Sequence, residues 1–203
     1  MARFTFYLAS GNVHKAAELQ ALAEASSLDV TVASARAIGG MPEVVEDSGT
    51  FVGNARIKAL ALRSRLPAGA WALADDSGLC VDALNGAPGV ESAYYAGPQG
   101  DSRANLAKLV EVMRDVPAAR RAAQFRCVLI ALGPDDAEQI FEGVCPGRLL
   151  VQPRGQGGFG YDPLFVPDGY DASLADLGDT IKNTVSHRAR AWQMLATWVR
   201  LKG

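Results

Sequence analysis

Cysteine and long apolar runs are both scarce in this sequence, and each shortage excludes a class of protein. The three cysteines show neither the C-x-x-C spacing of a zinc site nor a disulfide framework. No stretch approaches the roughly 18 uninterrupted apolar residues of a membrane span, and the start MARFTFYLASGN has too short an apolar core for a signal peptide. We therefore expect a soluble, cytoplasmic protein with no membrane partner, in which Cys80, Cys127 and Cys145 are reduced core thiols.

Net charge is also small. The sequence contains 20 Lys and Arg residues and 22 Asp and Glu residues, so the formal net charge is -2. This balance gives no general attraction to nucleic acid, and any anionic ligand must be held by a local cluster of bases. A chain of 203 residues that is 49% hydrophobic and 21% charged is globular in composition. We expect one domain spanning residues 1–203, large enough for two lobes around a cleft.

Hydrophobic periodicity predicts an α/β fold. Strands are expected near residues 3–9, 28–35, 122–132 and 139–151, and helices near residues 13–25, 51–65, 103–115 and 186–201. Helices and strands alternate in the first half, whereas the second half favours an antiparallel hairpin. This order predicts a mixed central sheet with flanking helices.

Two local features of this pattern are specific enough to test. The stretch WALADDSGLCV, residues 71–81, favours a strand, a turn and a second strand. In the helix near residues 51–65, Ile57, Leu60 and Ala61 are expected on one apolar face, with the basic residues Arg56, Lys58 and Arg63 largely elsewhere.

Two adjacent carboxylates, Asp75 and Asp76, interrupt the apolar stretch at residues 71–81. Acidic side chains are rarely buried unless they are paired or bind a cation. Successive side chains of a strand point to opposite faces, so one carboxylate can face a site while the other faces away. Three further acids, Glu43, Glu46 and Asp47, lie in an earlier loop.

Two familiar motifs, a dinucleotide-binding fingerprint and the paired triplets of an aspartic protease, fit poorly. GQGGFG, residues 155–160, matches a dinucleotide fingerprint, but Tyr161-Asp162-Pro163 follows where a helix is required. That stretch is then either a flexible loop or a loop whose backbone and Phe159 approach a ligand closely. The Asp-Ser-Gly triplets at Asp47 and Asp76 lie 29 positions apart, too close for the two β-rich lobes of an aspartic protease.

A serine hydrolase remains an alternative, because Ser77, His187 and an acid could assemble, although the nucleophile elbow G-x-S-x-G is absent. The Asp-Ser-Gly triplet at Asp47 need not belong to a protease site, because it could form the N-cap region of the following helix.

Other polar residues point to a nucleoside polyphosphate. SGNVHK, residues 10–15, offers backbone N–H groups and Lys15 at an expected helix N-terminus. Lys182 and Arg188 add positive charge, and the acids at positions 46, 75 and 76 supply oxygen ligands that suit Mg²⁺. No Walker P-loop is present.

Five ordered motifs resemble the inosine triphosphate pyrophosphatase family, whose members are also called XTP/dITP diphosphatases. They are SGNVHK (10–15), TFVGNARIKA (50–59), ADDSGL (74–79), GGFGYDPLF (157–165) and SHRARA (186–191). The resemblance implies an elongated fold of two lobes with the substrate cleft between them, and a homodimer. It also implies Mg²⁺-dependent hydrolysis of the purine nucleoside triphosphates ITP, dITP and XTP to monophosphate and diphosphate. A non-catalytic nucleotide sensor is the alternative from another class.

Matched positions then receive roles from the resemblance. Asp76 is the expected proton acceptor and a metal ligand, and Glu46, chosen over Glu43 and Asp47, is the second metal ligand. The expected substrate-binding residues are Ser10, Gly11, Asn12, Val13, His14 and Lys15 for the phosphates, Ser77, and Phe159, Gly160, Tyr161, Asp162, Lys182, His187 and Arg188 for the nucleoside.

The chain departs from the family pattern at two places. Tyr94 stands where the family usually has arginine, which puts any charge role there in doubt. Gly53 stands where the family usually has glutamate, and the spacing of the acidic loop before it is shifted.

Overall fold

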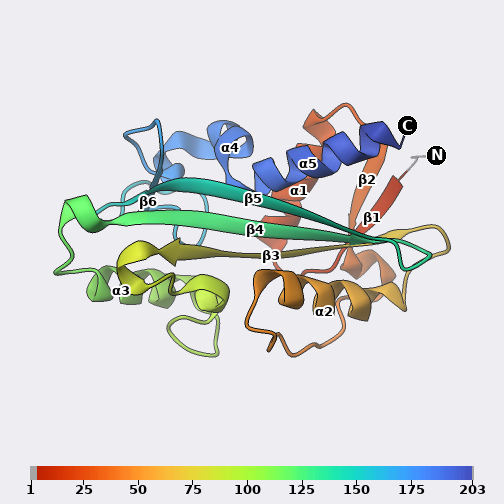
Figure 1. The fold of residues 1–203 in the computed structure, drawn as a ribbon, viewed down its shortest axis with the longest axis horizontal. Coiled ribbons are helices and arrows are strands. Elements are labelled where there is room, and N and C mark those ends of the chain that lie inside the picture. Colours follow the sequence, from red (N-terminus) through yellow and green to blue (C-terminus); the bar gives the residue numbers. More distant parts are fainter. Residues whose placement is uncertain (1–3, 203) are drawn as a thin grey trace. The chain divides into compact units, whose positions relative to one another are not determined.

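The computed structural model describes residues 4–202 and confirms the mixed α/β fold (Figure 1). Its strands are β1 (Phe4–Leu8), β2 (Val30–Ser34), β3 (Trp71–Val81), β4 (Ala122–Leu132), β5 (Glu138–Leu149) and β6 (Phe165–Pro167). Its helices are α1 (Val13–Ala25), α2 (Phe51–Arg63), α3 (Ser102–Val112), α4 (Leu174–Val185) and α5 (His187–Leu201). The expected strand start at Arg3 lies outside the described residues.

One sheet contains all six strands in the order β2-β1-β3-β4-β5-β6. β1 runs parallel to β2 and β3, and β5 runs antiparallel to β6. β4 and β5 are neighbours joined by a short turn, in which the Gly133 N–H donates to the Ala137 carbonyl at 2.8 Å. A connection this short cannot make a parallel crossover, so the expected antiparallel hairpin is confirmed.

The chain forms two compact units. Unit 1 contains residues 1–76, 127–143 and 188–203, and unit 2 contains residues 77–126 and 144–187. Three strands, β3, β4 and β5, contribute residues to both units. The expected cleft between two lobes and the single-domain boundary at 1–203 stay predictions.

Unit 1 has helices on both faces of its strands. Figure 1 shows α1 and α5 on one side and α2 on the other. Side chains of β4 alternate between the two: Leu129 packs in the cluster that includes α1 and α5, whereas Val128 and Ile130 pack in the cluster that includes α2. This period of two is what a strand buried on both faces requires.

Unit 2 has a core of its own. It includes Leu109 and Met113 from the α3 region, Leu174 from α4 and a T-shaped pair in which the ring centroids of Phe125 and Phe165 lie 4.8 Å apart. This core therefore holds α3 and α4 against strand residues of the same unit.

Residues 71–81 form one continuous strand, so the prediction of a turn within this stretch was wrong. The turn signal is local, whereas the strand continues because other segments of unit 2 hydrogen-bond to it: the Val81 N–H donates to the Ala87 carbonyl at 3.2 Å, and the Leu79 N–H donates to the Ser92 hydroxyl at 2.9 Å. This continuity places Asp75 and Asp76 on a strand held at both ends.

The expected apolar face of α2 was also wrong. Its buried residues are Asn54, Ala55, Lys58, Ala59 and Leu62, and Leu60 is 52% exposed. The helix begins at Phe51, and its N-cap is Thr50, whose hydroxyl accepts from the Gly53 N–H at 3.0 Å. Thr50 directly follows the Asp-Ser-Gly triplet at residues 47–49. A lysine therefore lies on the buried face of α2, where it needs a negatively charged partner.

Helix α4 was not predicted, because Gly178 interrupts it with φ 74°. All three cysteines are free thiols, and Cys127 and Cys145 are buried as expected, whereas Cys80 is half-buried. Within residues 4–202, no helix has the length and apolar character required to cross a membrane.

Candidate active site

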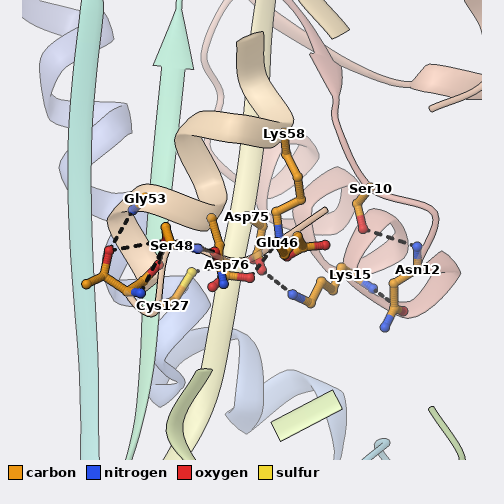
Figure 2. Close-up of polar contacts among 12 residues, drawn as sticks. Ser10, Asn12, Lys15, Glu46, Ser48, Gly53, Lys58, Asp75, Asp76 and Cys127 are labelled. Atoms are coloured by element: carbon orange, nitrogen blue, oxygen red, sulfur yellow. Dashed lines mark hydrogen bonds and ion pairs between the residues drawn. The ribbon is translucent and has the colours of Figure 1, made fainter. Parts of the chain in front are cut away.

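The two carboxylates of β3 contact different helices of unit 1. Asp75 hydrogen-bonds to Lys15 of α1 and Arg188 of α5, whereas Asp76 hydrogen-bonds to Lys58 of α2. They therefore face opposite sides of the strand, as alternation along β3 predicts. Figure 2 shows Lys15 and Lys58 approaching this pair of adjacent residues.

Asp75 lies at the centre of a buried network of charges. It is 0% exposed; its Oδ1 is 2.6 Å from Lys15 Nζ, and its Oδ2 is 2.7 Å from Arg188 Nε. Arg188 also donates to Glu18, and the Cys127 thiol lies 3.4 Å from Asp75 Oδ2. Burial alone would raise the pKa of Asp75, but Arg188 and Lys15 hold that pKa well below its usual value. Asp75 is thus a permanent anion that fixes two cations.

Asp76 and Glu46 share one ammonium group. Lys58 Nζ lies 2.7 Å from Asp76 Oδ1 and 2.8 Å from Glu46 Oε2. Burial raises the pKa of Asp76 to about 6, although Lys58 opposes this shift, and the nearby Glu46 adds to it. A carboxyl whose pKa lies near 6 can accept a proton at neutral pH and release it again.

The same two carboxylates fit a divalent cation. Asp76 Oδ2 is buried and has no hydrogen-bond partner among the described residues. In that same part of the chain, no group of three or more His, Cys, Asp or Glu side chains forms a complete metal cage. Mg²⁺ does not need such a cage, because it commonly binds through one or two carboxylates, water and substrate phosphates. The carboxylates of Asp76 and Glu46 therefore fit the kind of donor set that Mg²⁺ uses.

The acidic loop is anchored to the start of α2. The Ser48 hydroxyl donates to Asn54 Oδ1 at 2.7 Å, and the Ser48 N–H donates to the same oxygen at 3.2 Å. A Cβ at Gly53 would lie 2.3 Å from Ser48 Oγ. The glycine at this position therefore lets Ser48 pack closely on α2, two residues after Glu46 (Figure 2).

The segment at residues 10–15 forms a tight turn leading into α1. Asn12 Oδ1 accepts from the His14 and Lys15 N–H groups, and Ser10 Oγ accepts from the Asn12 N–H. Residues 11–14 are exposed, while the Lys15 side chain reaches inward to Asp75. The turn is thus preorganised at the positive end of a helix, where an anion is favoured.

In unit 2, three of the expected nucleoside-binding residues come together. Asp162 Oδ2 accepts from Lys182 Nζ at 2.6 Å and from the Phe159 N–H at 2.8 Å. The Lys182 ammonium also lies 4.4 Å from the centroid of the Phe159 ring. A Cβ at Gly158 would lie 2.3 Å from Asp162 Oδ2, so only glycine permits this loop to close on the carboxylate.

The remaining expected residues of unit 2 have separate surroundings. Tyr161 donates its hydroxyl to the Ser92 carbonyl at 2.9 Å, and the buried His187 ring stacks on Phe125 at 4.7 Å. Ser77 is half-buried on β3, directly after Asp76 in sequence. Tyr94, at the position where the family usually has arginine, is 52% exposed.

Sequence reasoning missed Lys58 and Glu18. Lys58 was expected off the apolar face because it is charged, yet its neighbours Ala55, Ala59 and Leu62 at helical spacing mark that face as buried. Glu18 follows Lys15 by three residues, so it shares its side of α1. Lys15, Lys182 and Arg188 each already pair with a carboxylate, so none is simply a surface cation awaiting phosphate.

Comparison with known proteins places this arrangement in a family. The family model described as "Ham1 family" matches residues 6–198. The chain belongs to the Ham1 family. A curated relative from Opitutus terrae named "dITP/XTP pyrophosphatase" is 64% identical over 198 residues, which cover 96% of this chain and 98% of the relative. A relative of the same name from Leifsonia xyli subsp. xyli is 45% identical over 194 residues, which cover 95% of this chain and 94% of the relative.

Solved structures of other Ham1 proteins have the same fold. A HAM1 protein from Coxiella burnetii superposes with a TM-score of 0.85 at 36% identity, covering 98% of this chain and 99% of that one. The Staphylococcus aureus Ham1 protein superposes with a TM-score of 0.84 at 33% identity, covering 98% of this chain and 100% of that one. The resemblance to the pyrophosphatase family is therefore confirmed, and this Ham1 chain is an enzyme of the hydrolase class.

Replacing Lys58 by methionine is expected to shift the pH dependence of turnover. Lys58 is the strongest influence that lowers the pKa of Asp76, so its loss moves that pKa above about 6. We expect kcat/KM at pH 7 to fall by about tenfold or more and to recover partly toward pH 9. A pH profile of kcat/KM measures the shift, and the exposed Lys202→Met is the control. An unshifted profile would contradict the role of Lys58.

Proposed function

We propose that this Ham1 chain hydrolyses ITP, dITP and XTP to the monophosphate and diphosphate, with Mg²⁺ as cofactor, and thereby removes these nucleotides from the nucleotide pool. The observation that carries the proposal is the pairing of Asp76 and Glu46 on Lys58, with Asp76 Oδ2 left without a partner among the described residues. The name of the relatives, "dITP/XTP pyrophosphatase", supports the substrate class.

Release of diphosphate requires attack at the α-phosphorus. A water oxygen bonds to that phosphorus, the bond to the oxygen bridging the α- and β-phosphates breaks, and Asp76 accepts the proton of the water. A pKa of about 6 leaves Asp76 mostly ionised at neutral pH, which is the form that accepts a proton. Bound Mg²⁺ would be held by Asp76 and Glu46 and would neutralise phosphate charge. Positioning and charge neutralisation carry most of such a reaction.

The resident charges keep Asp76 in place during this step. Lys58 holds Asp76 Oδ1 at 2.7 Å, which fixes the orientation of the carboxylate and leaves Oδ2 without a hydrogen-bond partner among the described residues. Asp75 fixes Lys15, which also lowers the pKa of Asp76 by its charge. The chain thus orients the proton acceptor from both faces of β3.

Base selection can rest on the exocyclic group at position 6 of the purine. Inosine and xanthine carry O6 where adenine carries an amino group, so a fixed donor from Arg188, His187 or a loop amide favours the oxo bases. Adenine would place its amino group against this donor, and such a polar mismatch can lower kcat/KM for the wrong base by as much as about 10⁴-fold. Rejection of guanine then depends on its 2-amino group.

Phe159 is expected to stack on the purine. Its N–H donates to Asp162, and the Lys182 ammonium lies over its ring, so the ring is held as a platform. Phe159→Leu should raise KM for ITP severalfold while changing kcat little, because stacking stabilises the bound substrate and transition state alike. Steady-state kinetics measure the split, and a fall in kcat with unchanged KM would contradict stacking.

Product analysis tests the proposed function. The protein is incubated with ITP or XTP and Mg²⁺, and released diphosphate and single phosphate are quantified separately, with ATP, GTP and dUTP run alongside. Diphosphate from ITP and XTP, with little from the other nucleotides and none in EDTA, is the expected result. Single phosphate would favour a phosphatase, and binding without product would favour the sensor.

Assembly and location complete the proposal. We place the protein in the cytoplasm as a homodimer that acts on free nucleotides, without nucleic acid or membrane as a partner. Light scattering coupled to size-exclusion chromatography measures the oligomeric state, and a mass of about twice 21.4 kDa is the expected result.

A further inference from the structure

Ser92 lies outside the expected site but contacts two of its segments, all within unit 2. Its hydroxyl accepts from the Leu79 N–H at 2.9 Å and donates to the Gly89 carbonyl at 2.6 Å. Its carbonyl accepts from the Tyr161 hydroxyl at 2.9 Å. Ser92 itself is 7% exposed. One buried residue therefore joins β3, just past Asp76, to the glycine-rich segment, residues 155–163.

The Ser92 hydroxyl takes the place of a strand partner. Alternate residues of a strand direct their N–H groups to the same edge, so Leu79 and Val81 share one edge of β3. The Val81 N–H donates to the Ala87 carbonyl, whereas the Leu79 N–H donates to a side chain, the Ser92 hydroxyl. Without that oxygen a buried backbone donor would lose its acceptor, so Ser92 keeps β3 in register at this point.

The backbone of Gly78 fits closely against the same residues. A Cβ at Gly78 would lie 2.2 Å from the Gly89 carbonyl oxygen and 2.5 Å from Ser92 Oγ. The Gly89 carbonyl is in turn held by the Ser92 hydroxyl. The position of Gly78, and of Ser77 before it, is therefore set by residues 89–92.

We propose that Ser92 is a positioning residue that holds Ser77 and Gly78 of β3 and the Tyr161 region of the glycine-rich segment in one fixed arrangement. This inference rests on the proposed function, in which Ser77 contacts the substrate and residues 159–162 contact the nucleoside. A displacement of either segment is transmitted through Ser92 to the other. Turnover depends on such positions because a misplacement of about 1 Å can lower a rate about 10²-fold.

Kinetics provide the first test. Ser92→Ala removes the hydroxyl but keeps the carbonyl that Tyr161 needs, and we expect kcat/KM for ITP to fall roughly tenfold at a temperature where the variant is folded. The control is Asp101→Ala, which removes the N-cap of α3 in the same unit and lowers stability without touching β3. Equal losses in the two variants would reduce Ser92 to a structural role and overturn the proposal.

Amide exchange followed by NMR provides a second test that needs no activity. Tyr161→Phe removes the hydrogen bond to the Ser92 carbonyl, and we expect the Leu79 amide to exchange about three- to tenfold faster, although Tyr161 does not bond to it. Asp101→Ala should leave the ratio of the Leu79 rate to other core amides unchanged. A Leu79 rate unaffected by Tyr161→Phe would refute the link.

The two tests separate this inference from the proposed function. Wild-type protein that releases diphosphate, together with a Ser92→Ala variant of wild-type kcat/KM, contradicts only the role of Ser92. Wild-type protein that releases no diphosphate contradicts the proposed function, and the exchange rate of Leu79 then decides whether Ser92 joins the two segments.

Discussion

Replacing Asp76 by asparagine is expected to lower kcat by about 10²- to 10⁴-fold while the protein stays folded, because asparagine cannot accept the proton of the attacking water. The amide also lacks the second anionic oxygen that the proposed Mg²⁺ site would use. The exposed Asp82→Asn is a matched control that should change kcat less than about twofold. Steady-state hydrolysis of ITP measures both variants, and near-normal turnover of Asp76→Asn would remove Asp76 from the mechanism.

The same variant should gain stability in the absence of metal. Burial raises the pKa of Asp76 from 3.8 to about 6. The neutral acid is thus favoured in the folded state, so the stability this group contributes is present below pH 3.8 and is lost as the pH rises through about 6. A shift of about 2 pKa units corresponds to at most about 3 kcal/mol at pH 8.

Denaturant unfolding in EDTA measures this gain. Asp76→Asn should be more stable than wild-type protein at pH 8 and similar to it at pH 4, where the wild-type carboxyl is protonated. Lys58 keeps Glu46 as a partner in the variant. If Asp76→Asn is instead less stable than wild type at pH 8, the ionised carboxylate of Asp76 stabilises the fold. That result would contradict the cost expected for its buried Oδ2, which has no hydrogen-bond partner among the described residues. Residues held in place for function commonly lower stability in this way.

Local periodicity predicted the features of this chain that depend on neighbours in sequence. Helix α1 and strand β4 have the predicted bounds of residues 13–25 and 122–132. The opposite directions of Asp75 and Asp76 also followed from the period of two along a strand. In each case, the determining residues lie within a few positions of one another.

Features that depend on distant residues were the ones missed. Ser77-Gly78 has the composition of a turn, but Ser92 and Gly89 supply partners that keep β3 extended. Lys58 looks like a surface residue until Glu46 and Asp76, 12 and 18 positions away, pair with it. The Gly178 break hides α4 from periodicity because it interrupts the helical pattern. Such partners become visible only once tertiary contacts form.

Asp75→Asn is expected to destabilise the protein by about 3–5 kcal/mol, because it leaves two cations, Lys15 and the buried Arg188, without their shared anion. For a chain of this length the midpoint of thermal unfolding should fall by roughly 6–20 °C. Glu18→Gln is the matched control: it removes the other carboxylate on Arg188 while Asp75 remains. Its effect should be smaller, since Asp75 contacts both cations.

The pH dependence of this loss distinguishes Asp75 from Asp76. Arg188 and Lys15 hold the pKa of Asp75 well below its usual value of 3.8 despite burial, so its stabilising contribution is present above that value and is lost only as the pH falls through the depressed pKa. The difference in unfolding free energy between wild-type protein and Asp75→Asn should therefore stay constant from pH 5 to pH 8. Denaturant unfolding across this range measures it, and a difference that grows or vanishes near pH 6 would show that Asp75 titrates there. Since Asp75 holds Lys15, the last residue of the SGNVHK segment, the variant should also weaken ITP binding in calorimetry, at a temperature where it remains folded.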